Sequence, residues 1–211
     1  MGIKIQIATA IAALCLAGCA SSSVKKTWKS PDYRGGVVQK IAVVGVEERG
    51  VLRKGFENRF VRDFREHSQE AIVTHELLTL QEMKADKQAA AARLRSAGAD
   101  SVLIVRLVDQ VTYDSQVRAN PAQFVGTVSG INSSYGWYDY YSLAFIEMGT
   151  VWSSSTTKVY IDASLYDLTT GQRLWSGLTK STLKETTDRV EEVDALVAKL
   201  VTAMRKDGMV R

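Results

Sequence analysis

Cysteine, proline and histidine are scarce in this chain of 211 residues, which contains two of each. Both cysteines, Cys15 and Cys19, lie near the N-terminus, and no residue after Cys19 carries a thiol. The rest of the chain therefore cannot form a disulfide bond, a thiolate metal site or a cysteine nucleophile. Its stability must come from a hydrophobic core, and about 180 residues are enough to build one.

The short motifs that mark common catalytic sites are also missing. The sequence has no glycine-rich phosphate loop, no His-Glu-x-x-His zinc motif and no Gly-x-Ser-x-Gly nucleophile elbow. His67 and His75 lie among glutamates, a pattern more typical of solvated side chains than of a metal site. Carboxylate pairs such as Glu47-Glu48 and Glu191-Glu192 lie where helices are expected to begin, and negative charge is favourable there. We therefore expect no enzymatic activity, no metal and no cofactor.

Charges of one sign do not gather in blocks. Lysine and arginine total 27 against 23 acidic residues, which gives a mild net charge of +4. Basic and acidic side chains are interspersed, as in Arg53, Lys54 and Glu57, a pattern typical of a solvated helix face. A mildly basic surface of this kind can lie against anionic lipid or glycan, but it gives no sign of a nucleic-acid site.

The first 18 residues have the pattern of a secretory signal peptide. Lys4 precedes a largely apolar run from Ile5 to Ala17, which is shorter than the roughly 20 residues that a membrane-spanning helix needs. Leu16-Ala17-Gly18-Cys19 follows at the end of that run and resembles the bacterial lipobox. The resemblance implies cleavage between Gly18 and Cys19 and lipid attachment, palmitate included, at Cys19. An ordinary signal peptide that ends near a cysteine is the alternative.

A lipid at Cys19 would anchor the protein, since two or three acyl chains together hold a protein firmly on a membrane. The next residues, Ala20 and Ser21, do not include the aspartate that favours retention in the inner membrane of Gram-negative bacteria. For a Gram-negative source we therefore expect the periplasmic face of the outer membrane. The predicted organisation is a signal peptide at 1–18, a lipidated tether at 19–35 and a periplasmic domain at 36–211.

Hydrophobic periodicity predicts an alternation of strands and helices in the first half of the domain. Short apolar runs at 40–46, 71–76 and 101–111 are typical of strands. Apolar residues three and four apart predict a helix between the first two of these strands, and a second helix is expected over 79–96. Helical connections of this length predict that the three strands are parallel. The helix face between the first two strands consists of Leu52, Phe56, Phe60, Val61 and Phe64.

The C-terminal part predicts a hairpin and a final helix. Apolar and polar residues alternate over 159–166, a tight turn containing Gly171 follows, and 173–182 returns as the partner strand. A last helix begins near Asp188 and ends near Gly208. The predicted fold is therefore an α/β (mixed α+β) domain in the order β-α-β-α-β-β-β-α. It has a single mixed sheet of about five strands, with helices packed on the sheet.

Local signals set several boundaries. Thr79 and Glu82 have the spacing of a capping box, which opens the helix expected over 79–96. Gly98 suits the left-handed residue that closes this helix. In the same way, Asp188 is expected to cap the last helix.

Three stretches within 36–208 resemble a group of bacterial envelope domains. They are Lys40-Ile41-Ala42-Val43-Val44, Gly98-Ala99-Asp100-Ser101-Val102-Leu103-Ile104, and Leu165-Tyr166-Asp167-Leu168-Thr169-Thr170-Gly171 followed by Arg173-Leu174-Trp175-Ser176-Gly177. The group includes the curli-secretion lipoprotein, the lipoprotein activators of penicillin-binding proteins and the N-terminal domain of TolB. The resemblance implies a shared fold and a non-catalytic role in envelope assembly, secretion or activation. No functional residue is carried over, because fold does not fix function.

A long aromatic segment at 114–155 separates the third and fourth predicted strands. Loops of this length are uncommon and usually functional or disordered, and aromatic residues are not typical of disorder. Three interpretations of the segment are open. It packs on the domain itself, it contacts a partner or another copy of the chain, or it enters a membrane as a hairpin. For a partner surface, tyrosine and tryptophan are the residues that dominate binding energy. The candidate contact residues are Tyr135, Trp137, Tyr138, Tyr140 and Tyr141.

The sequence therefore predicts an outer-membrane lipoprotein whose non-catalytic periplasmic domain binds, or helps to assemble, another envelope component. The expected partners are the membrane and either an envelope protein or further copies of the chain, with no nucleic acid and no small-molecule substrate. An oligomeric secretion-channel subunit of the curli-secretion type is one alternative. An envelope hydrolase is another, because catalysis by two carboxylates leaves no local motif.

Overall fold

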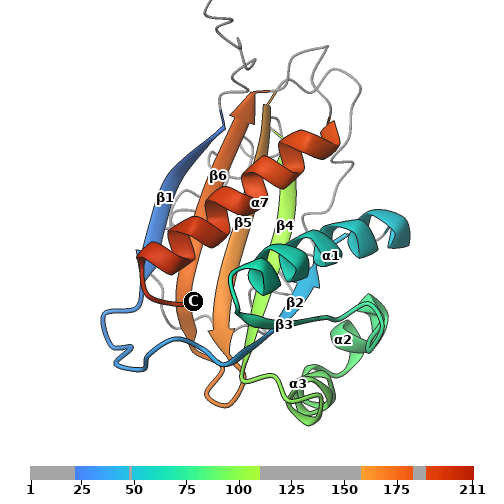
Figure 1. Cartoon of the computed structure of the whole chain (residues 1–211). Helices are drawn as coiled ribbons and strands as arrows, with labels where there is room; N and C mark the ends of the chain where they lie inside the picture. The colour runs from blue at the N-terminus through green and yellow to red at the C-terminus, as the bar shows by residue number, and fades with distance from the viewer. Residues whose placement is uncertain (1–21, 48, 110–157, 183–188) are drawn as a thin grey trace, which may run out of the picture.

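A six-stranded mixed sheet forms the centre of the domain (Figure 1). The structure, a computed structural model, describes residues 22–47, 49–109, 158–182 and 189–211. The strand order is β1-β6-β5-β4-β2-β3. The strands are β1 (Ser23–Lys29), β2 (Lys40–Gly45), β3 (Glu70–Val73), β4 (Ser101–Asp109), β5 (Lys158–Asp167) and β6 (Arg173–Thr182). This architecture confirms the predicted α/β class.

The pairing directions follow from the connections between strands. β2 runs parallel to both β3 and β4, to which it is joined through helical segments. β5 runs antiparallel to β4 and to β6, and a tight turn at Gly171, with φ of 71°, joins β5 to β6. Both directions agree with the prediction, because right-handed helical crossovers return strands in parallel and short turns return them in reverse.

The strand β1 is an addition to the five strands that the sequence predicts. It lies within the stretch expected to be a tether and pairs antiparallel with β6, from Ser23 beside Lys180 to Lys29 beside Trp175. The backbone of Ser30 continues this contact by donating to the Leu174 carbonyl at 2.9 Å. Lysines dominate the strand, so it lacks the apolar alternation by which strands are predicted. Such charged residues are typical of the edge of a sheet, where they discourage pairing with other chains.

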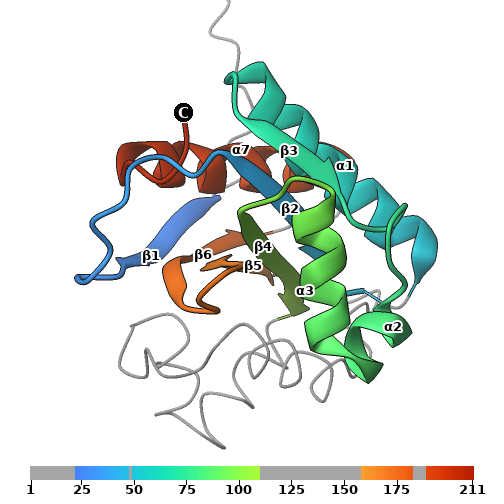
Figure 2. The same cartoon turned by 90° about the horizontal axis from the view of Figure 1, so that it is seen from below.

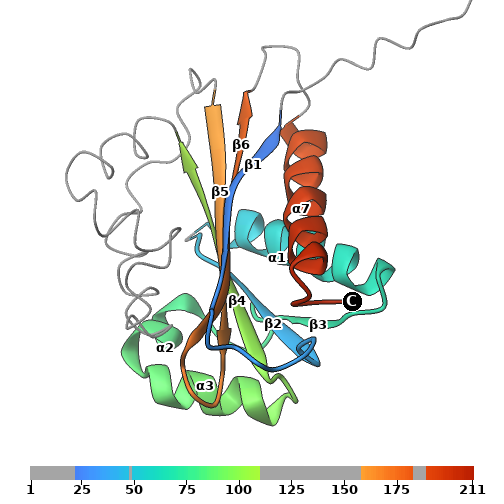
Figure 3. The ribbon, with the colours of Figure 1, turned by 90° about the vertical axis from the view of Figure 1, so that its left-hand side faces the viewer.

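Helices cover both faces of the sheet (Figures 2 and 3). α1 (Gly50–Glu66) and α7 (Arg189–Lys206) lie on one face, and α2 (Leu80–Ala85) and α3 (Lys87–Ser96) lie on the other near β2 and β4. The single helix predicted over 79–96 is therefore two helices. Asp86 interrupts it with φ of −141°, and its side chain accepts a hydrogen bond from the Ala89 amide at 2.9 Å. This new N-cap compensates for the break. None of the described helices is long and apolar enough to cross a bilayer.

The predicted helix boundaries are confirmed where the structure describes them. The Glu82 amide donates to the Thr79 hydroxyl at 3.1 Å, and the Thr79 amide donates to the Glu82 carboxylate at 2.7 Å. These two bonds complete the capping box, and the bonds that the Thr79 amide and hydroxyl donate to the Glu82 carboxylate lower the pKa of the Glu82 carboxyl. Gly98 and Gly208 have φ of 86° and 70°, as a left-handed helix end requires. Asp188, the expected cap of the last helix, lies outside the described residues.

Each face of the sheet contributes to its own core. On the α1 and α7 side, fully buried side chains include Phe60, Phe64, Trp175 and Leu200. Leu52 does not join this core as the helical spacing predicts, because it is 42% exposed near the start of α1. The other core joins α2 and α3 to β2 and β4, and includes Met83, Ala91, Leu94, Val102 and Ile104.

Gly177 tests how closely this core is packed. A Cβ atom built on Gly177 would lie 2.3 Å from Cη2 of Trp175 on the same strand. The indole has little freedom to move, since it is fully buried and its Nε1 donates to Asp207 at 2.7 Å. We expect Gly177→Ala to lower the free energy of unfolding by about 1–3 kcal/mol, measured by urea denaturation.

Gly36→Ala is the matched control, because nothing lies within 4 Å of its added Cβ. It should leave the free energy of unfolding unchanged within about 0.5 kcal/mol. Equal stability of the two variants would show that β6 and α7 tolerate added volume at this point.

Candidate functional site

The residues predicted from sequence to bind lipid or a partner all lie outside the described part of the chain. They are the cleavage and lipidation residues Gly18 and Cys19 and the aromatic residues Tyr135, Trp137, Tyr138, Tyr140 and Tyr141. The described strands nevertheless fix where the aromatic segment is attached. β4 ends at Asp109, which pairs with Val159 near the start of β5. The two ends of the intervening segment are thus attached to neighbouring strands, β4 and β5, at the same end of the sheet.

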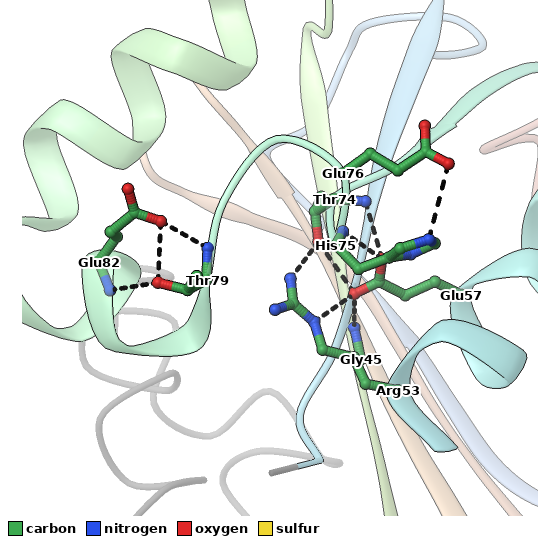
Figure 4. A network of polar contacts seen from close by, with 8 residues as sticks. All are labelled: Gly45, Arg53, Glu57, Thr74, His75, Glu76, Thr79 and Glu82. Atoms are coloured by element: carbon green, nitrogen blue, oxygen red, sulfur yellow. Dashed lines mark hydrogen bonds and ion pairs between the residues drawn. The ribbon is translucent and has the colours of Figure 1, made fainter. Parts of the chain in front are cut away.

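Within the described residues, the most extensive polar network surrounds the carboxylate of Glu57 (Figure 4). Glu57 and Arg53 lie one turn apart on α1. Gly45 ends β2, and Thr74 and His75 follow β3 directly. Because β2 and β3 are parallel neighbours, their carboxyl ends meet at the same edge, where α1 also begins. The network therefore joins three elements where ligands bind in many open α/β sheets.

Six hydrogen bonds reach the Glu57 carboxylate. Its Oε1 accepts from the Gly45 amide at 3.0 Å, from Arg53 Nε at 2.8 Å and from the Thr74 hydroxyl at 3.0 Å. Its Oε2 accepts from the amides of Thr74 and His75 at 2.8 and 2.7 Å and from His75 Nδ1 at 2.9 Å. A carboxylate has about four acceptor positions, so this one is saturated.

The ion pair between Arg53 and Glu57 is buried, with side-chain exposures of 7% and 0%. Arg53 Nη2 also donates to the Thr74 hydroxyl at 3.0 Å, which ties the pair to the residues after β3. A buried charge is tolerated only when it is paired and hydrogen-bonded, and Glu57 meets both conditions. The solvated helix face expected for these two residues is therefore wrong. They turn inward because the ends of β2 and β3 offer backbone amides that need acceptors.

His75 is also less solvated than the sequence predicts, since 12% of its side chain is exposed. Glu57 can only accept hydrogen bonds, so Nδ1 of His75 carries the proton that it donates. Nε2 then faces Glu76, whose Oε1 lies 3.8 Å away. The other histidine, His67, is one-third exposed, and its Nδ1 lies 2.9 Å from the Asp63 carbonyl. No group of three or more possible metal ligands occurs among the described residues.

A second polar group lies on the sheet face that α2 and α3 partly cover. Arg106 on β4 and Asp162 on β5 are register partners, and both Nε and Nη2 of Arg106 lie 3.0 Å from Oδ2 of Asp162. Ser164 and Tyr166 follow on the same face of β5, and burial raises the pKa of the Tyr166 hydroxyl. Ser176 on β6 pairs with Ser164. We call these five residues the polar sheet face.

The polar sheet face differs from the rest of the sheet in what lies over it. α3 packs through Ala91 and Leu94 against Val102 and Ile104, which precede Arg106 on β4. No described helix lies over the β5 and β6 part of this face (Figure 3). Buried hydroxyl and charged groups need hydrogen-bonding partners, so an apolar helix stripe would be a poor cover for them. In the sequence, the signal for this face is Arg106, which ends the apolar run of β4. Its pairing with Asp162 depends on the register of β4 and β5, which the sequence does not reveal.

The acidic residues in the stretches that resemble envelope domains hold turns. Oxygens of the Asp100 carboxylate accept from the backbone amides of Gln39 and Lys40 at 2.7 and 3.1 Å, which fixes the start of β2. Oδ1 of Asp167 accepts from the amides of Thr169 and Thr170 at 2.8 and 2.6 Å in the β5–β6 turn. These two carboxylates therefore stabilise the backbone conformation of their turns and give no sign of a ligand site.

No protein-family model matches the chain, and no curated protein matches it. Among solved structures, the PelC dodecamer from Paraburkholderia phytofirmans has a TM-score of 0.46 and 14% identity, covering 86% of this chain and 96% of that one. A point variant of that protein has a TM-score of 0.47 and 12% identity over the same shares. The lipoprotein GNA1162 from Neisseria meningitidis has a TM-score of 0.37 and 15% identity, covering 80% and 99%. Similarity at these values establishes neither a family nor a function.

The Glu57 network predicts a large loss of stability on a small chemical change. Glu57→Gln keeps the side-chain volume but removes the charge opposite Arg53 and turns an acceptor into a donor among amides. Breaking a buried pair in this way costs about 3–5 kcal/mol, which we expect to see in urea denaturation.

Glu66→Gln on the same helix is the control, since its carboxylate is 63% exposed and lies 4.0 Å from Arg62. Exposed pairs contribute about 0–1 kcal/mol, so this variant should unfold close to the unchanged protein. If Glu57→Gln were no less stable than Glu66→Gln, the network would not hold the ends of β2 and β3 together.

Proposed function

We propose that the chain is a lipoprotein anchored to the outer membrane through Cys19, with a periplasmic domain that binds or helps to assemble another envelope component without catalysis. The observation that carries the proposal is the Leu16-Ala17-Gly18-Cys19 stretch, followed four residues later by the first strand of a folded domain. A lipid at this position would hold the domain directly at the membrane surface. For a Gram-negative source, the lack of an aspartate at Ala20 and Ser21 favours the outer membrane over the inner one.

The roles of the buried acids support a domain that binds and does not catalyse. Glu57 and Asp162 are fully buried, and each is paired with an arginine. Glu192, also buried, accepts a hydrogen bond from Ser181. A general acid and base working on a glycan would need two carboxylates that converge on one open site. These three act instead as internal partners of neighbouring elements.

The aromatic segment between β4 and β5 supplies the proposed contact. Tyrosine and tryptophan present large, rigid area at low entropic cost, which is why they dominate binding surfaces. Trp137, Tyr138 and Tyr140 belong to the cluster of five aromatic residues at 135–141. The segment joins the sheet at Asp109 and Lys158, so a partner held there would lie beyond the edge at which β1 begins.

Replacing the lipidated residue tests the anchor. Cys19→Ala should leave the precursor unprocessed or release the domain in soluble form, because no thiol remains for the lipid. Cys15→Ala is the matched control, since it removes the other cysteine and leaves the lipobox intact. Membrane fractionation and the mass of the mature protein distinguish the two. Firm membrane attachment of Cys19→Ala in mature form would contradict the anchor.

Crosslinking in the native envelope tests the contact. A photoreactive group within 135–145 should capture one defined partner, and replacing Trp137, Tyr138 and Tyr140 together with alanine should abolish that product. Phe124→Ala, which changes another aromatic residue of the segment, should not. Capture of further copies of the chain, together with leakage from liposomes, would favour the secretion-channel alternative. Unchanged capture by the triple variant would contradict this contact.

A further inference from the structure

The register of the sheet brings the ends of several strands together at one end of the sheet. Ser23 at the start of β1 pairs with Lys180, and Lys158 at the start of β5 pairs with Thr182 at the end of β6. β4 ends beside them at Asp109. This end lies at the top of Figure 1, and the β5–β6 turn lies at the opposite end.

The stretch between the proposed lipid and the domain is short. The Ser22 carbonyl accepts a hydrogen bond from Lys199 Nζ, so the chain is already bound to α7 one residue before β1. Only three residue steps separate Cys19 from Ser22, and a fully extended chain covers about 11 Å over that length. Ser22 must therefore stay within about 11 Å of Cys19, and the start of β1 at Ser23 within about 14 Å.

The opposite end lies much farther from the point where the chain leaves the domain. β5 and β6 each contain 10 residues, which corresponds to about 33 Å of strand. An upright domain would therefore hold the β5–β6 turn well clear of the bilayer. A domain lying flat, on its side along β1, would bring both ends of the strands equally close to the bilayer. The length of the tether is compatible with either arrangement.

The distribution of charge along β1 distinguishes the upright arrangement from the flat one. Four lysines lie near the start of β1: Lys25 and Lys26 on β1, Lys180 beside Ser23 with its Nζ 5.5 Å from the centre of the Tyr160 ring, and Lys199 bound to Ser22. We call these four residues the basic end.

The far half of β1 has a different balance of charge. Acids are mixed with bases there: Lys29 donates to the carbonyl of Asp207 at 2.8 Å, Lys206 precedes that aspartate, and Asp32 and Arg34 are both exposed just after the strand. Anionic headgroups attract juxtamembrane lysines and repel acids, so they favour contact with the basic end and disfavour contact along the whole of β1.

We infer that the anchored domain stands upright, with the basic end lying on anionic lipid and the β5–β6 turn directed away from the membrane. This orientation rests on the proposed lipid at Cys19 and names the surface that the lipid brings to the bilayer. It also places the two attachment points of the aromatic segment, Asp109 and Lys158, on the side of the domain nearest the membrane.

Single thiols test the orientation directly, because the lipidated chain has no other free cysteine. Val24→Cys places one at the basic end without removing a lysine, and Gln172→Cys places one in the exposed β5–β6 turn. Each variant of the full lipidated chain is labelled with a fluorophore. It is then reconstituted in vesicles of phosphatidylcholine and phosphatidylglycerol that carry a nitroxide quencher on some headgroups. We expect several-fold stronger quenching at Val24→Cys than at Gln172→Cys.

The charge contribution is tested in the same assay. Lys25→Gln with Lys26→Gln should reduce the difference between the two labels, as should vesicles of phosphatidylcholine alone or about 0.5 M salt, which screens exposed charges. Lys54→Gln with Lys84→Gln, which lie on α1 and α2, should leave the difference unchanged.

The outcomes separate this inference from the proposed function. Flotation with the vesicles and the mass of the N-terminal peptide first establish whether the lipid is present. Labelled protein that does not float would overturn both the anchor and the orientation. Protein that floats but shows equal quenching at the two positions, or stronger quenching at Gln172→Cys, would overturn the orientation alone.

Discussion

Pairing between β1 and β6 determines how the domain relates to the start of the chain. Without β1, the residues after the lipobox would be a flexible tether of the kind that the sequence predicts. The domain could then take any orientation relative to the membrane. With β1 added to the sheet, the proposed anchor residue, Cys19, is three residues from a backbone that α7 already holds. If Cys19 carries a lipid as we propose, this edge strand would limit the orientations that the domain can take on the membrane, and the proposed role as a surface-bound binding module depends on that limit.

The polar groups inside the domain serve the same architecture. Glu57 collects donors from the ends of β2 and β3, which a parallel pair leaves unsatisfied at its carboxyl edge, and Arg53 balances the charge. Asp100 does the corresponding work where β2 begins. A domain without disulfides gains rigidity from such junctions, because each one fixes a loop that hydrophobic burial alone would leave free. The polar sheet face is the exception, since its charged and hydroxyl groups lie in the middle of strands.

Sequence periodicity was enough to predict much of this fold. β2, β4, β5 and β6 are apolar or alternating, and the Thr79 capping box and Gly98 depend on contacts within a few residues of each other. β1 could not be predicted because its partner strand is about 150 residues away and its own lysines carry no periodic signal. Glu57 and His75 could not be recognised either, since their burial arises only when α1 packs against the ends of two strands. The predicted lipid and partner residues remain predictions, because they lie outside the described residues.

The central claim is that Cys19 carries the lipid that brings this orientation about. Mass spectrometry of the mature N-terminal peptide, extracted from membranes of cells that express the unchanged chain, tests it most directly. The account predicts a peptide that begins at Cys19 with diacylglycerol on its sulfur and an acylated amine. A peptide that retains residues 1–18, or one with an unmodified sulfur at Cys19, would contradict it.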